Sequence, residues 1–565
     1  MKNPIMYIDG YKLDHRRQYP EGTEFVYSNL TARMSRNSDI QNIVAFGFQY
    51  FIKKYLLEEF NENFFKRDAS EIREYYTRRT NNYLGENNVG VEHIMELHKL
   101  GYLPIEIKAI PEGTLVPIKV PFLTIINTDP KFFWVTNYLE TILSNILWKG
   151  ITSATTAFTY RKKFEEYVKK TGYDKNFVKF QGHDFSFRGM SGVEDAVMSG
   201  AGHLLSFCGT DTIPAIDFLE EYYNANSDNE LVGVSVPATE HSVMSMNGKD
   251  SEIELFRKLI TEVYPSGIVS VVSDTWDFWK VISEYLPLLK EDVLNREGRL
   301  VIRPDSGDPV DIICGEKIEL INDDYDYKSF LMDAKQTLKE IVYNETPHGE
   351  YGVSSISRLF SYRGEYYKVT YEPDWNRYDK QYYYIDDYGL NTTEEKVTPT
   401  PQELGAYEVL WNIFGGTINK DGYKELHPSI GMIYGDSITL QRQKDILDKL
   451  ASKGFSSSNL VFGIGSYTYE YVTRDTFGMA MKATWGMCNG EPRELFKDPV
   501  TDSGFKKSLK GLIKVYKDSE GKLCAKDQCT PEEESETLLE TIFKDGVLIK
   551  ETSLKEIRDR IDSNF

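Results

Sequence analysis

The amino-acid sequence predicts an α/β fold in which helices alternate with parallel strands. Short runs rich in valine and isoleucine, such as "GIVSVVSD" at residues 267–274, have the length and composition of buried strands. Segments with apolar residues at helical spacing, such as "IELFRKLITEVY" at 253–264, lie between these runs. Three of the strands end in an aspartate, namely Asp274, Asp305 and Asp436. Because sites in parallel α/β folds form at the carboxyl ends of strands, this pattern also predicts where a site lies.

Three helices are predicted in the first 172 residues. The segment 42–60 has apolar residues at helical spacing, and the segment 132–148 is apolar enough to be a buried helix. A third helix is predicted over 153–172, where it ends in lysines and a glycine.

The alternation of strands and helices begins near residue 230. The predicted strands are 231–237, 267–274, 299–305, 430–436 and 459–466. The predicted helices between them are 253–264, 277–289 and 437–454.

The segment 312–402 interrupts this rhythm. It contains "SYRGEYYKVTYEPDWNRYDKQYYYIDDYG" at 361–389, which is dense in tyrosine and turn residues. Since tyrosine is a good strand former, we interpret the segment as an inserted, β-rich antiparallel appendage with a structural role.

The bulk composition excludes several classes of function. The net charge of −21 argues against general nucleic-acid binding, which needs a broad positive face. No apolar run approaches the length of a membrane span, and the N-terminus lacks the apolar core of a secretory signal. Five scattered cysteines in 565 residues are typical of a reducing compartment, so we expect a cytoplasmic protein.

One segment has the opposite charge. Residues 493–517 carry seven lysines and arginines, among them Lys497 and Lys506. The cluster is either a site for a small polyanion or a solvated loop face, and composition alone leaves both open.

Each strand-end aspartate also has two interpretations. Asp274, Asp305 or Asp436 taken singly is a good N-cap for the following helix. Three strands that end alike favour a site, because a barrel brings such ends onto one face.

Two further segments suit a phosphorylated ligand. "FGIGSYTY" at 462–469 places Gly465 and Ser466 after a strand, where backbone N–H groups can approach a phosphate, and Arg474 and Lys482 follow. "VPATEHSVMS" at 237–246 places His241 beside a glutamate, where it contacts phosphate, transfers protons or simply packs.

A third set suits a flat polar heterocycle. "GHDFSFRGMSG" at 182–192 offers Phe185 for stacking and Arg188 for polar contacts, and "FCGTDT" at 207–212 offers Asp211 as an acceptor for an amide. Together these segments predict a pocket for a sugar phosphate and a heterocycle.

Many of these motifs, in this order, resemble those of the nicotinamide phosphoribosyltransferase family, a group of type II phosphoribosyltransferases. The similar segments include "DGYKLDHRRQYP" (9–20), "HDFSFRG", "GTDT", "SVPATEHS", "SVVSD", "VIRPDSGDP", "YGDSITL", "FGIGS" and "FKDPVTD" (496–502). They extend over nearly the whole chain except about 312–402.

The resemblance implies an irregular α/β barrel with an N-terminal β-containing lobe. The expected divisions are an N-terminal α+β lobe at 1–150, partly completed by C-terminal segments, a catalytic barrel at 151–500 with its inserted appendage at 312–402, and a returning segment at 501–565. It also implies a homodimer with shared active sites. The expected reaction joins nicotinamide to 5-phosphoribosyl 1-pyrophosphate with Mg²⁺, coupled to ATP hydrolysis through a phosphorylated histidine.

The resemblance also implies roles for individual residues. Phe185 and, from the other subunit, Tyr11 would stack on nicotinamide, with Asp211 accepting from its carboxamide and Arg188, Arg303 and Ser235 nearby. Asp274, Asp305, Gly435 and Asp436 would serve the ribose and the Mg²⁺–pyrophosphate, Gly465 and Ser466 the 5′-phosphate, and His241 would be phosphorylated. The residues expected to hold phosphates are Arg33, Arg474, Lys482, Lys497 and Lys506. Ser466 replaces a glycine of the usual turn, so its N–H is useful only if its backbone angles are allowed.

Two alternatives to this function stay open. One is nicotinate phosphoribosyltransferase activity, against which Asp211 argues because a carboxylate would repel nicotinate. The other is a non-catalytic nucleotide-sensing protein on the same fold, against which the presence of Asp305, Asp436 and His241 argues.

Overall fold

The computed structural model describes residues 3–316, 318–345, 352, 355–378, 381–385, 392–435, 438–497 and 509–565. The chain divides into two compact units. Unit 1 comprises Met1–Lys162, Val178–Ser235 and Ile464–Phe565, and unit 2 comprises Lys163–Phe177 and Val236–Gly463.

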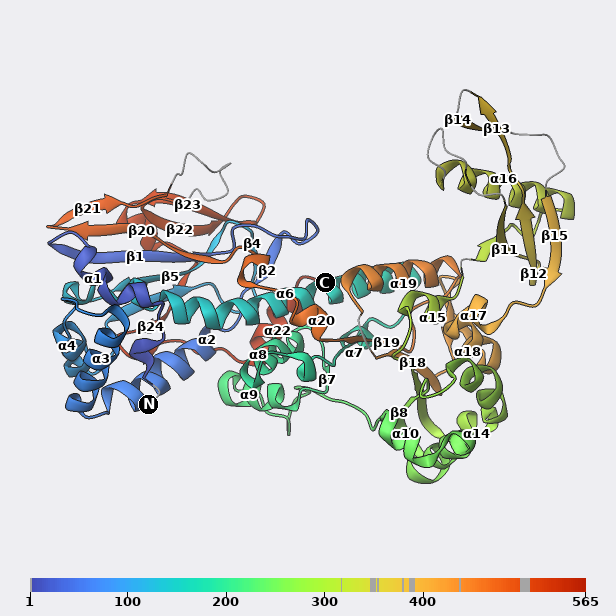
Figure 1. Ribbon diagram of the computed structural model, residues 1–565, viewed down its shortest axis with the longest axis horizontal. Coiled ribbons are helices and arrows are strands. Elements are labelled where there is room, and N and C mark those ends of the chain that lie inside the picture. The colour runs from blue at the N-terminus through green and yellow to red at the C-terminus, as the bar shows by residue number, and fades with distance from the viewer. Residues whose placement is uncertain are drawn as a thin grey trace. The chain divides into compact units, whose positions relative to one another are not determined.

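Unit 1 contains a seven-stranded antiparallel sheet built from both ends of the chain (Figure 1). Its strands, in spatial order, are β21 (Glu491–Glu494), β20 (Ala480–Cys488), β1 (Thr23–Thr31), β5 (Pro121–Asn127), β3 (Ile105–Ala109), β24 (Glu540–Lys544) and β25 (Val547–Leu548). Strand β1 pairs with β5 on one side and with β20 on the other. Segments more than 400 residues apart in the sequence are therefore neighbours in one sheet.

The helices of unit 1 begin and end differently from the sequence-based prediction in two places. The segment 42–60 starts as a short strand, β2 (Asn42–Val44), and becomes helical only at α2 (Phe48–Tyr50), which continues as a π-helix over Phe51–Glu59. Gly47, with φ of +97°, separates the two, and a helix cannot continue through that conformation.

The helices predicted at 132–148 and 153–172 form one long helix over most of their length. A short helix, α5 (Val135–Tyr138), precedes α6 (Glu140–Thr171), which runs without a break through Gly150. The threonines between the two predicted helices are compatible with the helix, because Thr152 and Thr155 donate to the carbonyls of Trp148 and Ile151 one turn earlier.

The remaining helices and small strands of unit 1 surround these elements. They are α3 (Ala69–Leu84), α4 (Glu92–Leu100), α7 (Val178–Gln181), α8 (Val193–Leu204), α9 (Ile213–Tyr223), α20 (Ser466–Tyr469), α21 (Pro531–Ser535) and α22 (Leu554–Asp562), with the strand pairs β2–β4 (Leu115–Pro117) and β22 (Leu512–Lys517)–β23 (Leu523–Cys529). A parallel pair, β6 (Gly182–Asp184) and β7 (Gly209–Thr210), carries the first predicted site residues.

The strand predicted at 231–237 is wrong. Within this segment only Val234 makes a bridge, to Gly209, and the rest is irregular. Beyond Leu231, valines alternate with Gly233 and Ser235, and the one bridge shows contact with the end of β7 rather than a full strand.

Unit 2 contains the parallel strands that the sequence predicts. Strands β8 (Ser266–Val272), β9 (Glu297–Arg303), β18 (Ile430–Tyr434) and β19 (Leu460–Ile464) pair in the order β19-β18-β9-β8. The helices among them are α10 (His241–Asn247), α11 (Glu252–Lys258), α12 (Phe278–Lys280), α13 (Leu286–Leu288), α14 (Lys290–Asn295), α15 (Pro309–Cys314), α17 (Pro401–Leu404), α18 (Ala406–Phe414) and α19 (Leu440–Ser452), and β16 (Gly416–Ile418) pairs with β17 (Lys424–Leu426). The prediction of a parallel α/β fold is confirmed.

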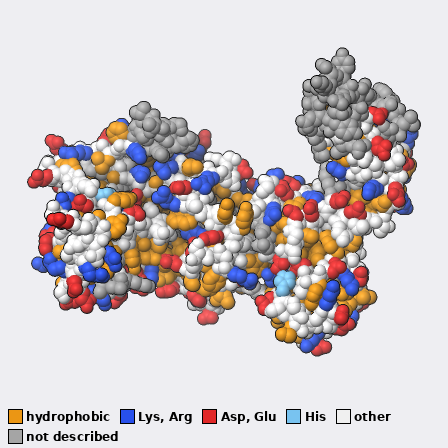
Figure 2. Space-filling view, in the orientation of Figure 1, with side chains coloured by type: hydrophobic (Ala, Val, Ile, Leu, Met, Phe, Trp, Pro, Cys, Tyr) orange, Lys and Arg blue, Asp and Glu red, His pale blue; other side chains and the backbone are white. Residues whose placement is uncertain are grey.

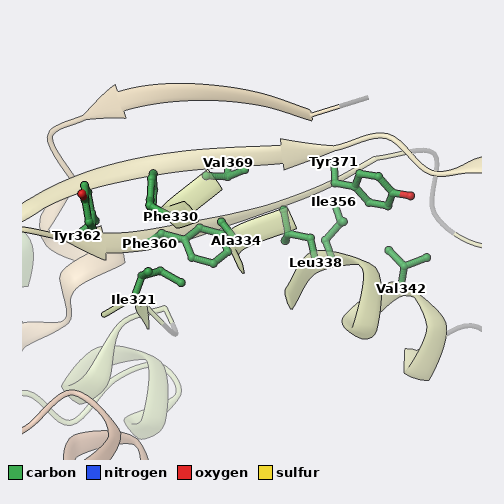
Figure 3. Packing of buried hydrophobic residues seen from close by; sticks show 10 residues of the cluster. All are labelled: Ile321, Phe330, Ala334, Leu338, Val342, Ile356, Phe360, Tyr362, Val369 and Tyr371. Atoms are coloured by element: carbon green, nitrogen blue, oxygen red, sulfur yellow. The ribbon is translucent and has the colours of Figure 1, made fainter. Parts of the chain in front are cut away.

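The inserted segment forms its own layer of helix on sheet within unit 2. Strands β10 (Ile318–Leu320), β11 (Ile356–Tyr362), β12 (Glu365–Tyr371) and β15 (Thr392–Val397) form a sheet, and β13 (Asp374–Tyr378) pairs with β14 (Gln381–Ile385). Helix α16 (Tyr327–Glu345) packs on the sheet through Phe330 and Leu338 (Figure 3). Phe330 stacks on Tyr362 with ring centroids 4.6 Å apart. The antiparallel β-rich prediction is confirmed, whereas the sequence reading did not foresee α16 or the parallel pairing of β10.

The surface carries both signs of charge. On the face in Figure 2, lysines and arginines are interspersed with aspartates and glutamates rather than gathered into one broad positive area. Within the described part of the chain, we find no helix with the length and apolar content that a bilayer crossing requires.

Candidate active site

The first group of predicted site residues surrounds the carboxylate of Asp211, just after β7 in unit 1. His183 Nε2 lies 2.8 Å from Asp211 Oδ1, and Ser235 Oγ donates to the same oxygen at 2.9 Å. The rings of His183 and Phe185 lie 4.5 Å apart between centroids. The Asp211 side chain is 48% exposed, so it is accessible to a ligand. The group offers an aromatic surface and a carboxylate acceptor, which suits a flat ring that carries an amide.

Asp184 fixes the loops that carry this group. Its buried carboxylate accepts hydrogen bonds from Ser186 N at 2.9 Å and from Thr212 Oγ1 at 2.7 Å. Its backbone carbonyl accepts a further hydrogen bond from Asp211 N at 2.9 Å. Asp184 is fully buried and these bonds satisfy it, so its role is structural. The ends of β6 and β7 are thereby tied together.

The loop after β6 also contacts the predicted phosphate turn. Phe185 N donates to Ile464 O at 3.0 Å, immediately before Gly465. A Cβ added to Gly189 would lie 2.6 Å from the Cβ of Ser466, so the turn that holds Arg188 can approach Ser466 only because residue 189 is glycine. Ser466 itself begins the helical turn α20 and is not among the residues with positive φ. The serine is therefore compatible with the backbone of this turn.

Four predicted phosphate ligands form one cationic cluster in unit 1. Lys482 lies in β20 opposite Asn29 of β1. Burial lowers the pKa of Lys482, and although Glu140 raises it, the positive charges of Arg33, Lys497 and Arg474 lower it further. Cations that repel one another in this way form a ready site for a multivalent anion.

Tyr11 lies on the exposed N-terminal segment of the same unit. Its side chain is 61% exposed, and its ring lies 5.1 Å from the ring of His15. Its hydroxyl donates to Asp9 at 3.5 Å, and burial, followed by the charge of Asp9, raises its pKa. An exposed ring held by neighbouring contacts is available to stack on another ring.

The second group of predicted residues lies in unit 2, at the carboxyl ends of β8 and β9. His241, Asp274 and Asp305 each offer a donor atom, and these atoms lie within 4.8 Å of one another. His241 Nε2 is 3.3 Å from Asp305 Oδ2, and its Nδ1 is 3.2 Å from Thr275 Oγ1. The His241 side chain is 48% exposed, so it is not a packed core histidine.

The aspartates of this group do not cap the helices that follow them. Asp274 Oδ2 accepts the backbone N–H groups of Asp305 and Ser306 at 2.9 and 2.8 Å, so it holds the end of the neighbouring strand β9. The N-caps of α12 and α15 are instead Asp277 and Asp308. The cap interpretation thus applies to other aspartates.

The carboxylates of Asp274 and Asp305 lie close together, so their negative charges repel each other. Burial raises the pKa of Asp305, and the negative charge of Asp274 raises it further, whereas His241 lowers it. Among the described residues no hydrogen-bond donor reaches the buried Asp274 Oδ1. A divalent cation would reduce the repulsion between the carboxylates and would coordinate the oxygen that has no hydrogen-bond donor. Hard carboxylate oxygens are the ligands that Mg²⁺ prefers.

Arg303 and Gly435 lie beside this group. Arg303 ends β9, paired in register with Val272 of β8. A Cβ added to Gly435 would lie 3.1 Å from both Arg303 Nε and Asp305 Cβ, so a glycine here lets β18 end close to both side chains. The predicted site residues Asp436 and Lys506 lie outside the described residues.

His183 is a site residue that the sequence analysis missed. It lies two positions before Phe185 at the end of β6, and a histidine next to a strand-end aspartate was a visible signal. Its partner, Asp211, is 28 positions away, and only the pairing of β6 with β7 brings the two together.

Comparison with known proteins identifies related chains along the whole length. The model of the "Nicotinate phosphoribosyltransferase (NAPRTase) family" matches residues 180–345 and 389–546, and that of the "Nicotinamide phosphoribosyltransferase, N-terminal domain" matches 3–107. The gap between the two matched parts falls inside the inserted segment.

Individual relatives are similar over nearly the entire chain. A nicotinamide phosphoribosyltransferase of Acinetobacter baylyi is 49% identical over 570 residues, covering 99% of this chain and 97% of that protein. One of Mycoplasma pneumoniae is 30% identical over 536 residues, covering 91% and 97%. The crystal structure of nicotinate-nucleotide pyrophosphorylase from Pyrococcus furiosus has a TM-score of 0.51 at 12% identity, covering 100% of this chain and 97% of that one, and supports the fold alone.

Proposed function

The chain belongs to the nicotinate phosphoribosyltransferase family, and we infer from this premise that it is a nicotinamide phosphoribosyltransferase, a pentosyltransferase that joins nicotinamide to 5-phosphoribosyl 1-pyrophosphate. The products are nicotinamide mononucleotide and pyrophosphate. The observation that carries the choice of base is the exposed Asp211 carboxylate, held by His183 and Ser235.

We assign nicotinamide to the group around Asp211. The ring stacks on Phe185, and its carboxamide donates to Asp211, with Arg188 in the same loop. The pyridine nitrogen carries no proton, so its attack on the sugar needs no general base. Positioning of the ring therefore supplies much of the catalysis.

We assign the pyrophosphate and ribose to the group in unit 2. By resemblance, Gly435 and Asp436 contact these parts of the substrate, whereas Arg303, which lies beside Gly435 and Asp305, is assigned to nicotinamide. Negative charge develops on the departing pyrophosphate, and cationic side chains that stabilise it lower the barrier.

Mg²⁺ fits the carboxylates of Asp274 and Asp305. The unsatisfied Oδ1 of Asp274 and the raised pKa of Asp305 support this assignment. When bound there with the substrate, the ion neutralises charge on the leaving pyrophosphate.

We propose that ATP phosphorylates His241. The imidazole is exposed and lies within 3.3 Å of Asp305. A phosphoryl group at this position adds negative charge beside the carboxylates and favours binding of the Mg²⁺-linked substrate.

The cluster of Arg33, Arg474, Lys482 and Lys497 is assigned to phosphate groups. We propose a homodimer in which Tyr11 and part of this cluster complete the active site of the partner subunit. The exposure of Tyr11 supports this assignment, because a ring 61% open to solvent has room for a partner. A cytoplasmic location agrees with five free cysteines.

Nicotinate is the alternative base. The family model carries that name, but a second negative charge beside Asp211 would be repelled. The test is turnover of the purified protein with each base and 5-phosphoribosyl 1-pyrophosphate, with and without Mg²⁺ and ATP. We expect nicotinamide mononucleotide as the main product, and a preference for nicotinate would overturn the assignment.

A further inference from the structure

Lys149 carries a charge that is almost completely buried in unit 1. The residue lies in the first third of α6 and is 4% exposed. Its Nζ lies 3.1 Å from Asp195 Oδ1 and 2.8 Å from Glu470 Oε2. A buried ammonium needs such compensation, and the geometry of the carboxylates around it is correspondingly fixed.

The two carboxylates reach from Lys149 to one exposed serine. Ser191 Oγ donates to Glu470 Oε1, and Ser191 N donates to Asp195 Oδ2 at 3.1 Å. Burial raises the pKa of Glu470, but the hydrogen bonds from Lys149 and Ser191 outweigh it and hold the pKa at about 2. Glu470 is therefore ionised at neutral pH.

The three elements tied by this network are those around the predicted phosphate turn. Glu470 follows α20, whose first residue is Ser466, and Asp195 lies in the first turn of α8. Ser191 ends the loop that contains Arg188, and Gly189 of that loop lies directly against Ser466. The network thus connects both sides of the turn that Gly465 and Ser466 form.

The end of the same loop that carries Phe185, the residue assigned to nicotinamide, is held by other hydrogen bonds. Ser186 is bonded to Asp184, and Phe185 N is bonded to Ile464 O. Loss of the Ser191 hydroxyl therefore loosens the Arg188 side of the loop, which keeps only its backbone bonds, such as Gly189 N to Ser186 O, and it leaves Phe185 in place.

We infer that Lys149, Asp195 and Glu470 form a positioning network that holds the Arg188 loop against the phosphate turn and thereby sets the affinity for the 5′-phosphate of the sugar substrate. The inference rests on the proposed function. It makes Glu470 and Ser191 positioning residues, since neither needs to touch the substrate.

Ser191→Ala is the direct test, because Ser191 is exposed and its hydroxyl is the link to Glu470. We expect the KM for 5-phosphoribosyl 1-pyrophosphate to rise about 3- to 10-fold, less than the full effect of a hydrogen bond to a charged group, because Ser191 acts through the loop and does not touch the substrate. The KM for nicotinamide and kcat should change less than the KM for the sugar substrate, because Phe185 and Asp211 keep their own bonds even though Arg188 is assigned to the same pocket. Ser191→Thr keeps the hydroxyl and should restore the wild-type KM, and Ser535→Ala, an exposed serine on α21, is the matched control.

A second pair of variants separates positioning from stability. Glu470→Gln keeps an acceptor for Ser191, whereas Glu470→Leu does not. We expect a small rise in KM for the first and a rise at least as large as that of Ser191→Ala for the second, measured with the melting temperature of each. If the melting temperature falls while the KM stays at the wild-type value, the network is only structural and the inference is wrong.

The outcomes also separate this inference from the proposed function. If the wild-type protein makes no nicotinamide mononucleotide, the proposed function fails. If the wild type is active and the KM of Ser191→Ala equals that of wild type, the positioning network alone is overturned.

Discussion

At the level of single residues, the proposed choice of base rests on the environment of Asp211. His183 and Ser235 both bond to Oδ1, and the side chain is 48% exposed. An amide donates to a carboxylate, whereas a second carboxylate is repelled by it. The preference should therefore reside in one side chain.

We predict that wild-type protein prefers nicotinamide over nicotinate by about 10²- to 10⁴-fold in kcat/KM, since losing a charge-assisted bond and adding repulsion costs several kcal/mol. Asp211→Asn should reduce this ratio by at least about tenfold, because asparagine no longer repels nicotinate. Steady-state rates with both bases test this. Asp217→Asn, an exposed aspartate on α9, is the control, and equal wild-type rates on the two bases would contradict the prediction.

His241 is expected to act through its phosphorylation. We predict that His241→Ala loses the stimulation by ATP and shows a raised KM for 5-phosphoribosyl 1-pyrophosphate, while a slower ATP-independent reaction continues. Initial rates with and without ATP measure both effects. Thr275→Val removes the contact to Nδ1 but keeps the imidazole, so it should retain ATP stimulation. A folded His241→Ala protein that responds to ATP as wild type does would exclude the phosphohistidine.

The sequence identified the residues of the candidate site better than their partners. Asp274 and Asp305 could be located because an apolar run that ends in aspartate is visible in the sequence. The hydrogen bond from Asp305 N to Asp274 Oδ2 could not be predicted from the sequence, because it depends on the strand register that places Val272 opposite Arg303. The same holds for His183, whose partner comes from another strand.

At the level of elements, the start of α2 shows a cap that comes from far along the chain. Glu112 accepts the N–H groups of Gly47 and Gln49 at 2.7 and 2.8 Å, and the Tyr223 hydroxyl at 3.0 Å. A carboxylate at a helix N-terminus is favourable, but this one is buried. Burial raises its pKa to about 7, although the three hydrogen bonds lower it.

This raised pKa makes the stability depend on pH. The folded state binds the proton of Glu112 more tightly than the unfolded state does, so its contribution is fully present below about pH 4.5 and is lost as the pH rises through about 7. The loss is on the order of 3 kcal/mol. We predict that Glu112→Gln flattens the dependence of the unfolding free energy on pH between about 5 and 8. Denaturant titrations across this range test it, with the exposed Glu520→Gln as control; an unchanged slope for Glu112→Gln would contradict the prediction.

The elements predicted correctly are those whose own pattern decides them. The strands of unit 2 and the helix α19 follow from short apolar runs and from amphipathic spacing. The prediction that a helix starts at residue 42 was wrong, because Gly47 adopts a positive φ and the carboxylate that caps α2 is that of Glu112. The predicted strand at 231–237 was wrong, because the apolar residues of this segment make only one bridge to a neighbouring strand.

At the level of the whole molecule, we predict that Tyr11 and Phe185 of one active site come from different subunits. Tyr11→Ala and Phe185→Ala proteins, each inactive, should regain part of the activity when mixed and allowed to exchange subunits, since the heterodimer then has one intact site. Each variant mixed with itself is the control. Activity that stays absent although exchange is proven by differently tagged subunits would contradict the shared site.

The parallel α/β arrangement of unit 2 was predictable from the alternation of strand and helix patterns, whereas the composition of the unit 1 sheet was not. Nothing in the residues of β1 identifies β20 as its neighbour, because the pairing of two strands so far apart in the chain is set by tertiary structure.

The pairing of β1 with β20 has a consequence for synthesis on the ribosome. About 450 residues separate the two strands. At a translation rate of roughly 5–20 residues per second, β20 is therefore synthesised on the order of 20 to 90 s after β1. During that time one edge of β1, whose residues 26–31 are buried in the finished protein, has no partner strand from the C-terminal part. The nascent chain therefore exposes an aggregation-prone edge until translation is nearly complete, and a chain that terminates before β20 cannot complete its N-terminal sheet.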